Sequence, residues 1–166
     1  MAGRQVALMR GINVGRAKRV AMAELRALVE ELGYRDVRTL LNSGNVVFTT
    51  PRLAPGNAAA RIENALAVRL GVSARITVLS AAELAAVVAE NPLGAIANDP
   101  SRLLVCVLAD AANRSKLKPL SKLDWGNEVL AIGTRVAYLW CPDGILASRL
   151  PEAVNRLPGD AVTTRN

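Results

Sequence analysis

Positive charge is concentrated in one short segment near the start of the chain. Four cationic side chains lie within residues 10–19, directly after an apolar stretch that ends at Met9. Arginine binds phosphate and carboxylate groups through paired hydrogen bonds, and the glycines at positions 11 and 15 let a ligand approach the backbone closely. We interpret residues 10–19 as one half of a binding site for a small anionic molecule.

A second polar segment, residues 42–45, separates two apolar stretches and has the sequence Asn-Ser-Gly-Asn. Glycine and asparagine are also the residues that tight hairpin turns require, so a purely structural role is the alternative interpretation. Together the two segments supply hydrogen-bond donors for a phosphate- or carboxylate-bearing ligand. The candidate ligand-binding residues are Arg10, Asn13, Lys18, Ser43 and Asn45.

A carboxylate in the last quarter of the chain marks a second candidate cluster. Asp143 stands within a Pro-Asp-Gly sequence that precedes an expected helix. The free amides of that helix are a place where an anion can bind. Aspartate is common in such turns for structural reasons, which is the alternative. The residues of this second cluster are Asp143, Ser148 and Arg165.

The residue types that are missing exclude several kinds of chemistry. The chain contains no histidine, which rules out Ser-His-Asp and Cys-His catalytic sites and histidine-ligated zinc. The glycine-containing segment lacks the Gly-Lys-Ser/Thr ending of a P-loop and does not match the dinucleotide fingerprint. Cys106 and Cys141 stand in apolar stretches, so we expect buried thiols and not a redox pair. We therefore expect no metal and no cofactor, and the sequence leaves enzymatic activity open.

The excess of positive charge is confined to the first half of the chain. Residues 1–80 hold 12 Lys and Arg against 5 Asp and Glu, whereas residues 81–166 hold 9 of each kind. This asymmetry favours an anionic partner. Nucleic-acid binding through the phosphate backbone is therefore the alternative to a small ligand. Base stacking has little support, because the first expected strand has no aromatic residue and the third has only Phe48.

A non-catalytic interaction protein is the third interpretation, because open sheet edges invite pairing and a homodimer is compatible with the sequence. No apolar stretch reaches the length of a transmembrane helix. The N-terminus also lacks a signal-peptide pattern, since Arg4 and Arg10 interrupt it. We expect no membrane partner and a cytoplasmic protein.

Hydrophobic periodicity predicts the same element order, β-α-β-β-α-β, in both halves. The expected strands are 5–9, 37–41, 46–50 and 75–79, then 102–108, 128–132, 136–141 and 161–164. The expected helices are 22–32 and 57–70, then 115–123 and 145–157. Between the halves a Ser-x-x-Glu capping box at Ser80 opens another helix, and residues 91–101 are turn-rich.

This order predicts an α+β protein made of two ferredoxin-like β-α-β-β-α-β halves, with antiparallel sheets and the helices packed on one face. The expected division is 1–80 for the first half, 81–101 for a helix and linker, and 102–166 for the second half. In such a unit the loop after the first strand and the hairpin after the second emerge at the same edge. We therefore expect residues 10–19 to lie beside residues 42–45, and residues 141–144 to share an edge with residues 163–166.

Several motifs together resemble an uncharacterised bacterial family, domain of unknown function 1697. The resemblance spans nearly the whole chain and implies a two-part α+β fold without supplying an activity, substrate or catalytic residue. The chain departs from the family pattern at Arg16, where a second glycine is usual, and at Arg149, where lysine is usual. The motifs are Arg10-Gly11-Ile12-Asn13-Val14-Gly15, Met22-x-x-Leu25, Ser43-Gly44-Asn45-Val46, Pro142-Asp143-Gly144 with Ser148-x-Leu150, and Thr164-Arg165-Asn166.

Overall fold

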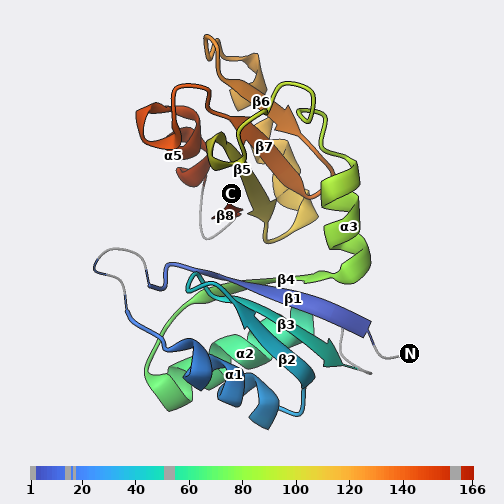
Figure 1. The fold of residues 1–166 in the computed structure, drawn as a ribbon, viewed down its shortest axis with the longest axis vertical. Helices are drawn as coiled ribbons and strands as arrows, with labels where there is room; N and C mark the ends of the chain where they lie inside the picture. Colours follow the sequence, from blue (N-terminus) through green and yellow to red (C-terminus); the bar gives the residue numbers. More distant parts are fainter. Residues whose placement is uncertain (1–2, 14–15, 17, 51–54, 158–161) are drawn as a thin grey trace. The chain divides into compact units, whose positions relative to one another are not determined.

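Two four-stranded antiparallel sheets, one in each half of the chain, organise the protein (Figure 1). The computed structural model describes residues 3–13, 16, 18–50, 55–157 and 162–166. The chain divides into two compact units, Met1–Leu84 and Ala85–Asn166, and each is described here by itself. The residues outside the described part include Gly15, which the sequence pattern assigned to the cationic loop, and Ala161, the first residue of the last expected strand.

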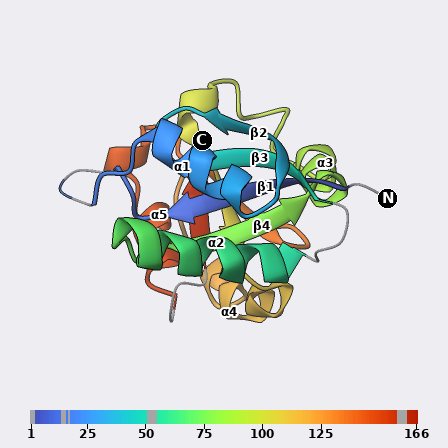
Figure 2. The same ribbon diagram turned by 90° about the horizontal axis from the view of Figure 1, so that it is seen from below.

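The first sheet has the strand order β2-β3-β1-β4, which is the order that a split β-α-β unit produces. Its strands are β1 Gly3–Arg10, β2 Arg35–Leu40, β3 Asn45–Thr50 and β4 Arg75–Ser80. Two helices, α1 Met22–Glu31 and α2 Pro55–Leu70, both cover the same face of this sheet (Figure 2). The predicted α+β arrangement with helices on one face is therefore observed in this unit.

The core of the first unit lies between that face and the two helices. Alternate residues of the strands point into it, as the two-residue period of a strand requires. Leu25, Leu28 and Val29 come from α1, and Ile62 and Leu66 come from α2. The sheet contributes Ala7, Met9, Val46, Phe48 and Val78 among others.

The second sheet repeats the arrangement with the order β6-β7-β5-β8. Its strands are β5 Leu103–Leu108, β6 Val129–Ile132, β7 Val136–Trp140 and β8 Val162–Arg165. In both sheets the expected strands end within two residues of the observed bounds. Its core again consists of aliphatic side chains, with the two cysteines buried among them.

The helices of the second unit are shorter than the sequence pattern predicts. The single helix expected over 115–123 is instead a 3₁₀ turn at Ala111–Asn113, the one-turn helix α4 Arg114–Leu117, and another 3₁₀ turn at Leu120–Lys122. Pro119 explains the interruption, because it has no N–H with which to continue the helical hydrogen bonds, although Lys118 before it keeps helical dihedral angles.

The helix expected over 145–157 is likewise divided. A 3₁₀ turn occupies Ile145–Ala147, and α5 begins only at Leu150 and ends at Asn155. Pro151 lies in the first turn of α5, where its missing N–H costs nothing, so a helix can begin here. Gly144 therefore precedes a short turn and not the long helix whose amides were expected to hold an anion.

The capping box that was predicted at Ser80 is present. The Ser80 N–H donates to Glu83 Oε2 at 2.8 Å, and the Glu83 N–H donates to Ser80 Oγ at 3.1 Å. The helix that follows, α3, spans Ala81–Ala89. Among the described helices, none combines the length and the apolar character needed to cross a membrane.

Candidate functional site

The loop after β1 is closed by the side chain of Asn13. Its Nδ2 donates to the Val20 carbonyl and to the Asn42 carbonyl, both at 2.9 Å. Its Oδ1 accepts from the Val20 N–H at 2.9 Å. One amide side chain thus fastens the two ends of the cationic loop together and joins them to the hairpin. The predicted convergence of residues 10–19 with residues 42–45 is confirmed by these contacts.

Apolar packing reinforces the same junction. Ile12 is 1% exposed, although it stands in a loop. It packs against Gly44, where an added Cβ would lie 2.8 Å from Ile12 Cδ1 and 2.8 Å from Met9 Cβ. Gly44 also has a φ of +79°, and its carbonyl accepts from the Met9 N–H at 3.0 Å. Glycine is required here both by the backbone conformation and by the space.

The hairpin itself is held by its own polar side chains. Asn45 Nδ2 donates to the Leu40 carbonyl at 3.1 Å and to Ser43 Oγ at 2.9 Å. Leu41 adopts a φ of +58° and is 81% exposed, so the tip carries an apolar side chain in a conformation that leucine rarely takes. Two of the predicted ligand residues, Ser43 and Asn45, therefore stabilise the turn.

The remaining two predicted ligand residues lie at the ends of the loop. Lys18 Nζ donates to the Gly71 carbonyl at 2.7 Å, just beyond the C-terminus of α2. A cation is favourable there because the last helix carbonyls carry partial negative charge. Arg10 is the last residue of β1 and pairs with Arg75 of β4. The Nη1 atom of Arg75 lies 3.5 Å from Glu63 Oε2.

A hollow of about 300 Å³ opens between the loop and the hairpin. It lies in front of the N-terminus of α1. The N-cap residue of this helix, Ala21, has no side-chain acceptor and makes no capping hydrogen bond. The first amides of a helix lack partners within the helix and attract anions. The lining residues are Asn13, Arg19, Val20, Ala21, Met22 and Asn42.

Charge around this hollow is predominantly positive. Arg19 is exposed, with one guanidinium nitrogen 3.5 Å from the Asn13 carbonyl. Arg16, farther out on the same loop, is also exposed. Glu24, in the first turn of α1, is the acidic side chain that opposes them. The arrangement provides a cationic rim, an uncapped helix start and an apolar wall, which together can hold one small anion.

The second predicted cluster is made of three residues with separate local contacts. Asp143 accepts from Asn127 Nδ2 at 2.8 Å. Ser148 Oγ accepts from the Leu150 N–H at 3.2 Å, at the start of α5. Arg165 donates to Thr163 Oγ1 at 3.1 Å and to the Thr164 carbonyl at 2.9 Å, and burial lowers the pKa of its guanidinium. The ends of β7 and β8 do flank the start of β5, as expected.

Both cysteines are buried free thiols, as predicted. Burial raises the pKa of Cys106 to about 11, although Thr164 Oγ1 donates weakly to its sulfur at 3.6 Å. Burial also raises the pKa of Cys141. A thiol whose pKa is raised is a poor nucleophile at neutral pH. Among the described residues no cluster of Cys, Asp and Glu is arranged to hold a metal ion.

The sequence pattern indicated the two segments that border the hollow and, among its lining residues, Asn13. Arg19 and Asn42 are not among the predicted ligand residues, because the pattern of glycine and asparagine indicates residues that shape turns. The signal for Arg19 was available, since it is the last cation before the first residue of an uncapped helix. The contact between Lys18 and Gly71 spans 53 positions, and no local pattern indicates it.

Comparison with known proteins places the chain among relatives without an assigned activity. A family model described as a protein of unknown function (DUF1697) matches residues 2–138. Among solved structures, a conserved bacterial protein from Streptococcus pneumoniae has a TM-score of 0.81 and 25% sequence identity, covering 100% of this chain and 93% of that chain. No curated protein sequence matches the chain.

Proposed function

Because the chain belongs to the DUF1697 family, which carries no assigned activity, we propose a function from the first unit's geometry: it binds a small phosphate- or carboxylate-bearing molecule. The observation that carries this proposal is the hollow of about 300 Å³ that Arg19, Asn42 and the uncapped start of α1 share. A hollow of this size admits a ligand of metabolite dimensions.

Each lining group has a distinct task in this proposal. The Arg19 guanidinium pairs with two oxygens of the anion, because its planar donors match a phosphate or carboxylate. The amides at the start of α1 and the Asn42 side chain bind the remaining oxygens. Val20 and Met22 form the apolar wall, which limits water and strengthens these hydrogen bonds.

The originally predicted residues serve this site mainly by holding it in place. Asn13 fixes the distance between the loop and the hairpin, and Ser43 and Asn45 fix the hairpin turn. Lys18 anchors the loop to the end of α2, and Arg10 adds positive charge at the end of β1. The strand order of each sheet supports the description of both units as ferredoxin-like, with the site at the edge where the β1 loop and the hairpin meet.

Calorimetric titration with inorganic phosphate and with citrate at low salt tests this proposal. We expect Arg19→Ala to weaken binding about tenfold or more, the typical worth of a charge-assisted pair of hydrogen bonds. Arg26→Ala is the matched control, because it removes the same charge from an exposed position on α1. Equal affinities for the native protein and Arg19→Ala would overturn the proposal.

Removal of a negative charge beside the hollow provides an independent check. Glu24 lies in the first turn of α1 and repels an anion bound at the helix start. We expect Glu24→Gln to strengthen phosphate binding about two- to fivefold, with the gain lost as salt screens the charge. Affinity unaffected by Glu24→Gln at low salt would place the anion elsewhere.

A further inference from the structure

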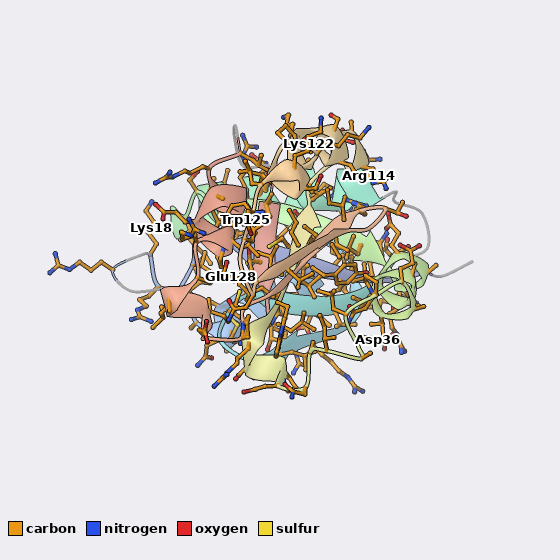
Figure 3. All side chains as sticks on the ribbon, turned by 90° about the horizontal axis from the view of Figure 1, so that it is seen from above. Lys18, Asp36, Arg114, Lys122, Trp125 and Glu128 are labelled. Carbon is orange, nitrogen blue, oxygen red and sulfur yellow. The ribbon has the colours of Figure 1, made fainter. Side chains whose placement is uncertain are left out.

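A second hollow, of about 390 Å³, lies on the opposite face of the same sheet. Its lining residues are Arg4 of β1, Asp36, Arg38 and Leu40 of β2, and Val47 of β3. Val46 and Phe48 point into the core beneath the helices, so Val47 between them points to the other face. The two hollows share no lining residue, and in Figure 3 Asp36 lies far from Lys18 of the cationic loop.

The register of the strands places the two arginines along one row of the sheet. Arg38 pairs with Val47, and Arg4 pairs with Thr49, two positions farther along the same face of β3. At the other end of the hollow Leu40 pairs with Asn45. Four residues separate the pairs at the two ends, so the hollow extends about 13 Å along β3, at about 3.3 Å per residue.

The described part of the chain provides no partner for the charged groups of this hollow. Within the described part of the chain, the side chains of Arg4, Arg38 and Asp36 take part in no hydrogen bond and no ion pair. Two guanidinium groups and one carboxylate thus border a hollow whose other lining residues, Val47 and Leu40, are apolar. The register places Asp36 beside the arginines and Leu40 at the far end, since Arg35 pairs with Thr49 and Leu40 with Asn45. The balance is one net positive charge, which suits a ligand with an anionic group, hydroxyl donors next to it and an apolar end.

The edge of β2 is unsuited to an added strand. Its register with β3 shifts between Arg35 and Arg38, and Asp36 has a φ of +52°. Such a bulge interrupts the row of backbone groups that a second strand needs for pairing. Whatever binds here lies on the face of the sheet and contacts side chains, which argues against strand addition by a peptide.

We propose that this hollow binds a nucleotide. Its phosphate pairs with Arg4 and Arg38, its ribose hydroxyls donate to Asp36 beside them, and its base lies on Val47 and Leu40 toward the other end. The apolar floor and the length of about 13 Å favour a phosphate with an attached ring system over a bare anion. A duplex does not fit this chemistry, because the faces of its bases are stacked inside and only base edges, sugars and phosphates are exposed. The nucleotide is either free or part of a single strand.

Calorimetric titration with AMP, ribose 5-phosphate and inorganic phosphate tests the assignment on the full chain. We expect AMP to bind about tenfold tighter than ribose 5-phosphate, because the contact of the base with the apolar floor is added. Arg4→Ala and Arg38→Ala should each reduce AMP affinity about tenfold. Arg114→Ala, an exposed arginine of α4 in the other unit, is the matched control and should leave the affinity unchanged.

Asp36 distinguishes a sugar phosphate from a simple anion. Asparagine tolerates the positive φ at this position, so Asp36→Asn preserves the backbone while removing the charge. We expect this variant to bind AMP and ribose 5-phosphate more weakly and inorganic phosphate no more weakly than the native protein. Equal affinity for AMP and ribose 5-phosphate in the native protein, or AMP binding unaffected by both arginine variants, would overturn the proposal.

Two further arms identify the source of the nucleotide and separate this site from the first one. In fluorescence anisotropy, the affinity for labelled single-stranded oligo(A) should rise with its length if the natural ligand is a nucleic acid. It should not exceed the affinity for AMP if the natural ligand is a free nucleotide. Arg19→Ala should leave AMP binding at this hollow unchanged, so each of the two proposed sites can be disproved independently of the other. Displacement of AMP by poly-glutamate, but not by oligo(A), would overturn the assignment in favour of an acidic peptide.

Discussion

Gly44 and Ile12 lie so close together that the smallest side chain at Gly44 would overlap Ile12, with an added Cβ only 2.8 Å from Ile12 Cδ1. This contact connects the two most recognisable motifs of the sequence, the Arg-Gly-Ile-Asn of the loop and the Ser-Gly-Asn of the hairpin. Both motifs therefore have a structural reason to be present together. The candidate anion site is a consequence of their contact, because the same contact aligns the loop with the start of α1.

Gly44→Ala should be strongly destabilising. The substitution imposes a left-handed backbone conformation on alanine, about 1–2 kcal/mol, and overpacks the junction at Ile12 and Met9, about 1–3 kcal/mol more. Urea unfolding should show a loss of about 2–4 kcal/mol. Gly71→Ala is the control, since Gly71 also has a positive φ of +62° but an added Cβ would meet nothing within 4 Å. Similar losses in the two variants would contradict the close approach of Ile12.

Substitution of Asn13 should lower the free energy of unfolding and also weaken anion binding. Asn13→Gly keeps the positive φ and removes the three side-chain hydrogen bonds to Val20 and Asn42, for an expected cost of about 1–3 kcal/mol. Asn42→Ala is the informative comparison, because the Asn42 contact uses its backbone carbonyl and survives the change. Chemical unfolding should separate the two variants by at least about 1 kcal/mol, and equal stabilities would remove Asn13 from this role.

The fold was predictable because it depends on periodic, local information. Alternating apolar residues define the strands, and glycines such as Gly33 and Gly71 end the helices of the first unit. The element order then allows few topologies. The prediction was wrong only where a single residue overrode the pattern, as at Pro119, which divides the helix expected over 115–123. Pro119 has no N–H to continue the helical hydrogen bonds, and apolar periodicity does not reveal that loss.

The candidate site was predictable only in outline. The strand topology brings residues 10–19 to residues 42–45, and this followed from the element order alone. Which side chains remain available to a ligand depends on contacts between distant residues. Lys18 is engaged by Gly71, and Asn13 is engaged by Val20 and Asn42. A sequence displays donors, but it does not show which of them the fold already uses.

The capping box at the start of α3 makes a separate, local prediction. Ser80→Ala removes the oxygen that accepts from the Glu83 N–H at 3.1 Å and should cost about 1 kcal/mol. Glu83→Gln should cost less, because an amide oxygen still accepts from the Ser80 N–H. Thermal unfolding of both variants measures the difference. A larger loss for Glu83→Gln than for Ser80→Ala would mean that the charge of Glu83, and not the reciprocal hydrogen bonds, stabilises this helix start.

Cys106 should make the protein less stable in alkali. Burial raises the pKa of its thiol from an ordinary value of 9.0 to about 11 in the folded state. In the unfolded chain the thiol therefore loses its proton at lower pH, so the unfolded state is favoured as pH rises from about 9 to about 11. The stabilising contribution is complete below the unfolded pKa and disappears through that interval. Two pKa units correspond to about 2.7 kcal/mol as an upper bound.

Cys106→Ala isolates this contribution from the other groups that titrate in the same range. The variant loses stability from its cavity at every pH, but its free energy of unfolding should fall less steeply than that of the native protein between pH 9 and pH 11. Alkylation adds a direct measurement, because a buried thiol with a raised pKa should react with iodoacetamide at pH 8 only after unfolding. Parallel pH profiles for the two proteins, or rapid alkylation of the folded chain, would show that Cys106 is more accessible than its burial of 99% implies.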